Sequence, residues 1–211
     1  MRDGQFATDE ELKAMVTDFV GRAGFEWSAL VNDCSEVVVF GSHAAGLQTP
    51  LSDLDVLVVS KPGITLTFPP QSCIDLVLRT EDQVHSADWL KSELAGHIAV
   101  YGRWLHGAGS WRVKALERLG KDSAAAEAKR RRIGRLTHSL RTHWDRLTPD
   151  FRVRNLTTLR REAQRLNLLE SGVAVPPTRL LDNWAERDSL GNDAHVRATS
   201  GLADVTPALP R

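Results

Sequence analysis

The chain has 211 residues, a formal net charge of zero and an apolar content of 42%, which are ordinary values for a soluble globular protein of one or two domains. No apolar run is long enough to span a bilayer, and the first residues are polar and acidic. Neither a membrane span nor a secretory signal is therefore expected. Cys34 and Cys73 lie far apart beside apolar segments, which predicts buried free thiols and a cytoplasmic protein.

The zero net charge hides an asymmetry between the two halves of the chain. Residues 1–100 hold 6 Lys and Arg against 15 Asp and Glu, whereas residues 101–211 hold the other 21 basic and 12 acidic residues. The first half therefore has a net charge of −9 and the second a net charge of +9. Such a division indicates two functional layers, an acidic one suited to a metal ion and a basic one that could face an anion.

A helix and a buried strand are the first elements expected. Thr8 and Glu11 have the spacing of a capping box, and apolar residues then recur at helical spacing. The apolar run 37–40 is typical of a short buried strand. Residues 46–52 are rich in Gly, Thr, Pro and Ser, which predicts a loop.

Two further apolar strands carry carboxylates. Asp53 and Asp55 stand at the start of a strand that runs to residue 59, and Asp75 lies within a third strand over 74–78. Because alternate strand side chains point to opposite faces, Asp53 and Asp55 share one face. Two neighbouring carboxylates repel each other unless a cation lies between them. Mg²⁺ prefers oxygen ligands of this kind, so the pair predicts a metal site.

The second half of the chain is expected to be helical. A helical pattern runs from Glu81 to Leu105, and Gly107 and Gly109 end it. Further helices are predicted over 133–147, from Thr148-Pro149 onward, and from Pro176 to Trp184. The predicted domains are a catalytic domain over 1–108 and a helical domain over 120–188, followed by a flexible tail over 189–211.

The pattern of Gly41-Ser42, a ten-residue spacer and Asp53-Leu54-Asp55, with Asp75 in a later strand, resembles the signature of the polymerase-β-like nucleotidyltransferase superfamily. The similarity is to its minimal and antibiotic-type members and covers residues 35–80 closely. It implies an α/β (α+β) fold, in which a small mixed β-sheet with flanking helices forms the nucleotidyltransferase core and a C-terminal helical bundle packs beside it.

The resemblance also implies an activity and its residues. The enzyme would move a nucleoside monophosphate from an NTP, ATP by default, to a hydroxyl acceptor and release pyrophosphate. Asp53, Asp55 and Asp75 would be catalytic and would hold two Mg²⁺ ions, with Mn²⁺ as a substitute, and Asp75 could accept the hydroxyl proton. The nucleotide-binding residues would be Gly41, Ser42 and Ser52, although Ser52 also fits a purely structural role in its turn.

The basic half leaves its own role and the acceptor open. Its cations form either a solvated helix face or a basic wall over the metal cleft; they include Lys129, Arg130, Arg131, Arg132, Arg135, Arg152, Arg154, Arg160, Arg161 and Arg165. Its charge favours an anionic or nucleic-acid acceptor over a polycation. Two alternatives remain, a toxin–antitoxin-type nucleotidyltransferase that modifies tRNA or a partner protein, and a nucleotide-binding module without turnover. The intact carboxylate trio argues against loss of turnover. No membrane partner is expected, and a homodimer stays open.

Overall fold

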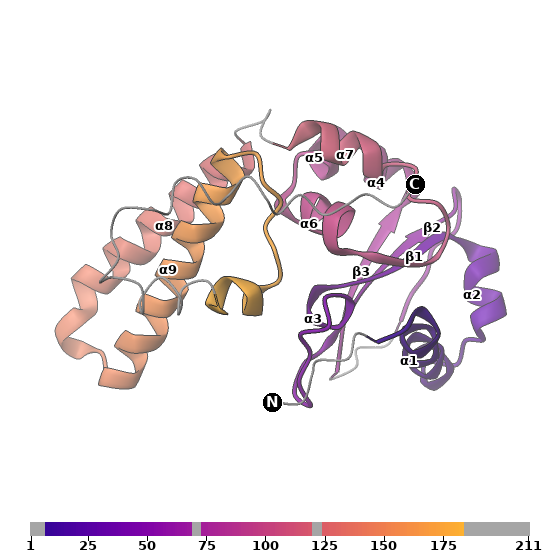
Figure 1. Cartoon of the computed structure of the whole chain (residues 1–211), viewed down its shortest axis with the longest axis horizontal. Helices are drawn as coiled ribbons and strands as arrows, with labels where there is room; N and C mark the ends of the chain where they lie inside the picture. Colours follow the sequence, from indigo (N-terminus) through magenta and orange to yellow (C-terminus); the bar gives the residue numbers. More distant parts are fainter. Residues whose placement is uncertain (1–6, 69–72, 120–123, 184–211) are drawn as a thin grey trace.

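The computed structural model describes residues 7–68, 73–119 and 124–183. Its centre is a four-stranded mixed sheet with the strand order β3-β2-β1-β4 (Figure 1). The strands are β1 (Cys34–Phe40), β2 (Leu54–Ser60), β3 (Ile74–Thr80) and β4 (Arg103–His106). Strand β1 is antiparallel to both β2 and β4, whereas β2 and β3 are parallel. The predicted mixed sheet with flanking helices is confirmed.

Helices cover both faces of this sheet (Figure 1). One face packs against α1 (Asp9–Arg22) and α2 (Trp27–Asp33), and the other against α4 (Glu81–His85), α5 (Ala87–Leu90), α6 (Glu93–Tyr101) and α7 (Arg112–Arg118). Helix α1 begins after Thr8, whose hydroxyl accepts from the Glu11 amide while the Glu11 carboxylate accepts from the Thr8 amide. The predicted capping box is confirmed.

The alternation of side chains along β2 decides which face carries its carboxylates. Val56 and Val58 pack in the core beneath α1, and Leu57 and Val59 pack in the core beneath α6. Because alternate residues share a face, Asp55 lies on the α6 face with Leu57. The apolar pattern of the strand therefore aims its acidic residues toward α6.

The single helical segment expected up to Leu105 is wrong. Helix α6 ends at Tyr101, and residues 103–106 form the edge strand β4 beside β1. Gly102 allows the change of direction, since a Cβ there would lie 2.6 Å from the Ile98 carbonyl oxygen. The unpaired edge of β1 offers backbone partners to this segment, which outweighs its helical spacing.

A buried carboxylate holds the segment that follows β4. Glu36 of β1 is 4% exposed and accepts hydrogen bonds from the Trp104 and Trp111 indoles, at 3.2 and 2.9 Å, and from the Ser110 amide at 3.1 Å. Trp111 is fully buried and is the N-cap of α7, a helix that the sequence did not predict. These contacts explain how a charged residue can occupy the sheet interior.

The cysteine expectation is half wrong. Cys34 is buried at the start of β1, and burial raises the pKa of its thiol to about 11. Cys73 is exposed, because it precedes β3 at the outer edge of the sheet. In the described residues, no helix has the length and apolar character needed to cross a membrane.

A helical hairpin lies beside the sheet domain (Figure 1). It consists of α8 (Ala124–His143), a short 3-10 turn η1 (Trp144–Arg146) and α9 (Pro149–Glu170). Thr148 caps α9 and Pro149 occupies its first turn, as predicted. Along α9, Leu156 and Ala163 are exposed while the charged Glu162 is buried.

After α9 the chain returns toward the sheet domain. Residues 174–177 are buried, and residues 178–183 are helical, so the last helix begins two residues later than predicted. The predicted end of that helix at Trp184 and the predicted tail over 189–211 lie outside the described residues, as do parts of the predicted domain limits.

Candidate active site

Three strands bring the predicted carboxylates to one edge of the sheet. Asp55 of β2 is paired in register with Phe40 of β1 on one side and with Asp75 of β3 on the other. Partners in a parallel pair point to the same face, so Asp55 and Asp75 both lie on the α6 face. Asp53 immediately precedes β2 and shares that face. The predicted trio is therefore adjacent in the structure.

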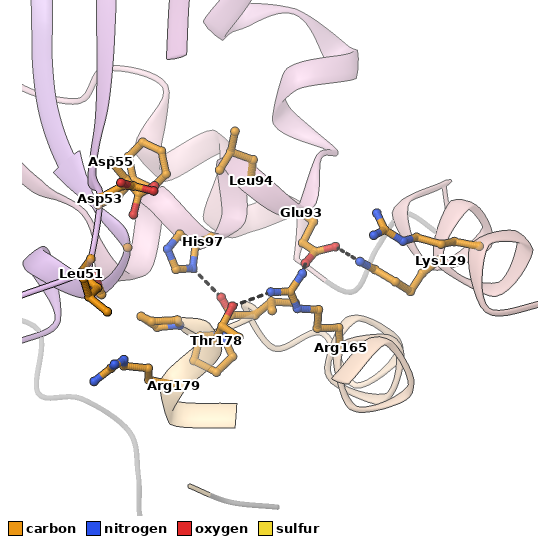
Figure 2. A pocket seen from close by; sticks show the side chains of 18 residues that line it. Leu51, Asp53, Asp55, Glu93, Leu94, His97, Lys129, Arg165, Thr178 and Arg179 are labelled. Carbon is orange, nitrogen blue, oxygen red and sulfur yellow. Dashed lines mark hydrogen bonds and ion pairs between the residues drawn. The ribbon is translucent and has the colours of Figure 1, made fainter. Parts of the chain in front are cut away.

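A cavity of about 680 Å³ opens above this edge, between the sheet domain and the helical hairpin (Figure 2). Asp53 and Asp55 line it together with Gly41, Ser42 and Ser52. Asp75 is exposed and does not line it. Five of the six predicted site residues thus face one cavity, and the sixth stands beside it on the neighbouring strand.

The carboxylates repel each other where they meet. The pKa of Asp55 is raised to about 6, first by burial and then by the charges of Asp75 and Asp53. Mg²⁺ commonly uses one or two carboxylates and completes its shell with water and substrate phosphates. In the described part of the chain no three His, Cys, Asp or Glu residues gather closely enough to hold a metal alone. The oxygen-only pair nevertheless fits a hard divalent cation shared with a phosphate ligand.

Gly41 makes room for Asp55. It follows β1 at the start of the short helix α3 (Gly41–Ala44) and has a φ of +68°. A Cβ added there would lie 1.8 Å from Oδ2 of Asp55. The glycine is therefore required both by its backbone conformation and by the carboxylate that occupies the space next to it.

The loop before β2 is held by its own hydrogen bonds. Ser52 Oγ accepts from the Thr49 amide at 2.9 Å, so its structural role in the turn is present, while its nucleotide contact stays a prediction. His43, which is buried, has Nε2 3.3 Å from the Ser52 carbonyl oxygen. Arg179 donates to Thr49 Oγ1 at 3.2 Å and connects this loop to the C-terminal segment.

The wall opposite the carboxylates is basic. Helices α8 and α9 and residues 178–183 contribute its cations, which are Lys129, Arg132, Arg165 and Arg179. Other arginines of the hairpin point elsewhere, since Arg130 pairs with Glu170 and Arg161 pairs with Asp182. Some basic residues therefore form a wall of the cavity, and others form ion pairs away from it, so each of the two interpretations describes a part of the basic half.

Most of the charge in this wall is already paired. Lys129 is 8% exposed, and its Nζ lies 2.7 Å from Glu93 Oε2 and 2.8 Å from Glu162 Oε2. Arg165 lies 3.7 Å from both glutamates and donates to Thr178 Oγ1 at 2.9 Å. Arg132 stands 3.8 Å from Glu162, and its side chain is 57% exposed. Arg132 and the exposed Arg179 are therefore the wall cations best able to meet a ligand.

Two residues of α6 complete the cavity, and sequence reasoning missed both. Glu93 and His97 stand one helical turn apart and line the cavity between the carboxylates and the basic wall (Figure 2). Burial lowers the pKa of His97, whose Nδ1 lies 2.7 Å from the Val175 carbonyl oxygen. The available signal was the spacing of these two polar residues on one side of an otherwise apolar helix.

Part of the chain is similar to a known protein family. Residues 24–100 match the nucleotidyltransferase domain family. No match to the chain is found among curated proteins. A solved structure described as a toxin–antitoxin with AMP-PNP is similar at 22% sequence identity, over 47% of this chain and 88% of that chain, with a TM-score of 0.33. The segment that matches the family contains every predicted site residue as well as Glu93 and His97.

Proposed function

We propose, since residues 24–100 match the nucleotidyltransferase domain family, that the protein transfers a nucleoside monophosphate from an NTP to a hydroxyl acceptor. The observation that carries this proposal is the cavity itself, which has Asp53 and Asp55 on one side and a basic wall on the other. A nucleoside triphosphate with its divalent cation has the complementary charges, because its metal needs carboxylates and its phosphates need cations. ATP is the default donor on the strength of the family resemblance.

The acidic side of the cavity would hold the divalent cation. Asp53 and Asp55 would bind Mg²⁺ or Mn²⁺, and Asp75 would join them from β3 if a second ion is bound. When present, the metal supplies charge stabilisation for the attacking and leaving oxygens of the displacement. The raised pKa of Asp55 supports this role, since a bound cation would relieve the repulsion that Asp75 and Asp53 exert on it.

The remaining residues would orient the phosphates. Ser42 can donate its hydroxyl to a phosphate oxygen, and Gly41 next to it carries no side chain to obstruct the approach. Arg132 would neutralise the departing pyrophosphate from the opposite wall. The acceptor hydroxyl oxygen would form a bond to the α-phosphorus while the bond from that phosphorus to pyrophosphate breaks.

The charge around the cavity bears on the acceptor. The net charge of +9 in residues 101–211 supports an anionic or nucleic-acid acceptor more than a polycation. The negative charge of Glu93 weakens this preference only partly, because Lys129 already neutralises that charge. A tRNA or a partner protein as acceptor, as in toxin–antitoxin-type enzymes, is a specific outcome of the test that follows.

The decisive experiment offers α-³²P-labelled ATP, GTP, CTP and UTP to the protein in a cell extract, with MgCl₂, MnCl₂ or EDTA. We expect label to enter one fraction among small molecules, RNA and protein, with release of pyrophosphate and only when the divalent ion is present. D53N serves as the inactive control. If the wild type transfers no label and releases no pyrophosphate from any NTP, the transferase proposal is wrong, and an NTP-binding measurement then decides whether a binding module remains.

A further inference from the structure

His97 lines the cavity and has no task in the proposed chemistry. Its imidazole lines the cavity with Asp53 and Asp55 and lies between them and the Arg165–Thr178 contact (Figure 2). The ring is held between two aromatic neighbours, with its centroid 6.1 Å from that of Phe40 and 5.4 Å from that of Tyr101. Phe40 is the register partner of Asp55, so the imidazole is positioned relative to the carboxylates through a rigid strand.

The backbone of the segment after α9 determines which ring nitrogen of His97 carries the proton. Nδ1 lies 2.7 Å from the carbonyl oxygen of Val175, and a carbonyl can only accept, so Nδ1 carries the hydrogen. In a neutral ring Nε2 is then an unprotonated acceptor. Among the described residues, no hydrogen bond to Nε2 is formed. A lone pair therefore remains available on the cavity side of the ring.

The charges around the ring favour its neutral form. Burial is the largest cause of the lowered pKa of His97, and the charge of Arg165 lowers it further. The hydrogen bond to the Val175 carbonyl and the charge of Glu93 raise it, but the net direction is down. Asp53 and Asp55 line the same cavity from the start of β2. Lys129 lies 2.7 Å from Glu93 and offsets its negative charge, so Glu93 stabilises the protonated imidazole only weakly. At neutral pH the imidazole is thus ready to accept a proton.

We propose that His97 is the general base of the nucleotidyl transfer, an inference that rests on the proposed function. Nε2 takes the proton of the acceptor hydroxyl as the hydroxyl oxygen bonds to the α-phosphorus and the bond to pyrophosphate breaks. The imidazolium then returns its proton to water after the products leave. The family resemblance offers Asp75 for this task, but Asp75 is exposed and does not line the cavity, whereas His97 does.

The C-terminal segment acquires a role through this residue. Val175 is 3% exposed, and the hydrogen bonds from Arg165 to Thr178 and from Arg179 to Thr49 hold the chain on either side of the cavity. The tautomer of His97 therefore depends on a segment that lies 78 residues away in the sequence. The segment that follows the hairpin therefore completes the hydrogen bonding of the imidazole that α6 supplies.

His97→Asn is the matched test. Asparagine can place its amide nitrogen near the Nδ1 position and keep the bond to Val175, but it has no group at the Nε2 position. We expect kcat for transfer to the labelled extract fraction to fall about 10²–10⁴-fold, with unchanged NTP affinity and unchanged thermal unfolding. Tyr101→Phe, which keeps the neighbouring ring, should behave like the wild type. His97→Ala should lose the same activity and also unfold at a lower temperature.

A pH profile separates the base from a merely structural residue. The wild-type rate should fall toward acid pH as His97 is protonated, and H97N should lack this limb. Any acid limb that arises from loss of the divalent ion should move to lower pH at higher MgCl₂, whereas the His97 limb should stay in place. If H97N keeps wild-type kcat while D75N loses it, Asp75 is the base and this inference is wrong. If the wild type itself transfers no label, the proposed function and this inference both fall.

Discussion

The acidic sheet edge and the basic helical hairpin form two sides of one cavity, but they hold their charges by different means. At the sheet edge, backbone register places like charges together, and they raise the pKa of Asp55. In the hairpin, Lys129 is buried between two glutamates and is largely neutralised. The sheet edge is therefore electrostatically incomplete without a cation, whereas Lys129 of the hairpin is neutralised within the protein by Glu162 of α9 and Glu93 of α6. We therefore expect changes at the sheet edge to affect activity most and changes at Lys129 to affect stability most.

The largest expected effect is on activity and comes from the sheet edge. Asp53→Asn keeps the shape of the side chain but removes the charge that would bind the divalent ion, so transfer should be abolished. The measurement is label transfer from α-labelled NTP, with circular dichroism and thermal unfolding to verify the fold. Wild-type transfer by this variant would contradict the site assignment.

The next effect should appear in the hairpin and should concern stability. Lys129→Met leaves Glu93 and the buried Glu162 without their main cation, which should lower the free energy of unfolding by about 3–5 kcal/mol. Urea denaturation measures this change. Arg130→Met removes a surface pair with Glu170 and should cost under about 1 kcal/mol. An equal decrease in the free energy of unfolding of the two variants would show that the buried ion pairs contribute no more to stability than the surface pair.

A smaller effect is expected where the backbone meets the acidic pair. Gly41→Ala forces a side chain into the left-handed region, at about 1–2 kcal/mol, and also displaces Asp55, because the new Cβ would lie 1.8 Å from its oxygen. Gly63→Ala is the control, since Gly63 has a φ of +79° with nothing near the position of a Cβ. Both variants should lose stability, but only G41A should lose transfer activity. Full activity in G41A would mean that Asp55 need not occupy this position.

The smallest expected effect is a gain in stability without metal. In the folded protein Asp55 keeps its proton up to about pH 6, against a reference value of 3.8 in the unfolded chain. Stability of the metal-free protein should therefore fall as the pH rises from about 4 to 6. Asp55→Asn should stabilise it by about 1–2 kcal/mol at pH 7, after allowance for solvent screening, and the gain should shrink toward pH 4. A D55N variant less stable than wild type in EDTA at pH 7 would contradict this account.

The sheet edge was predictable because its information is local. Strand periodicity places Asp53 and Asp55 on one face, and the family resemblance added Asp75 to them before the structure was known. The parallel register of β2 and β3 places Asp75 beside Asp55. Strand β4 was missed because Trp104 and Leu105 continue the helical spacing of α6, while the free edge of β1 that captures them is a tertiary feature.

The sequence alone could not separate the basic residues that line the cavity from those that pair on the surface. Lys129 and Arg130 are adjacent in the sequence, yet one is buried against Glu93 and the other pairs on the surface with Glu170. Only the packing of α8 against α9 and α6 separates them. His97 was missed for a related reason, since its partner is a backbone carbonyl 78 residues further along the chain.

The parallel pairing of β2 with β3 has a consequence for changes in chain length. Leu76 and Leu78 pack against the core beneath α1 and anchor the register of β3, so the position of Asp75 does not depend on the connection before the strand. Deleting one residue inside β3 would turn Asp75 to the far face. An insertion among the exposed residues 62–65 would leave the carboxylate row in place, which makes this part of the connection a suitable position for a reporter peptide.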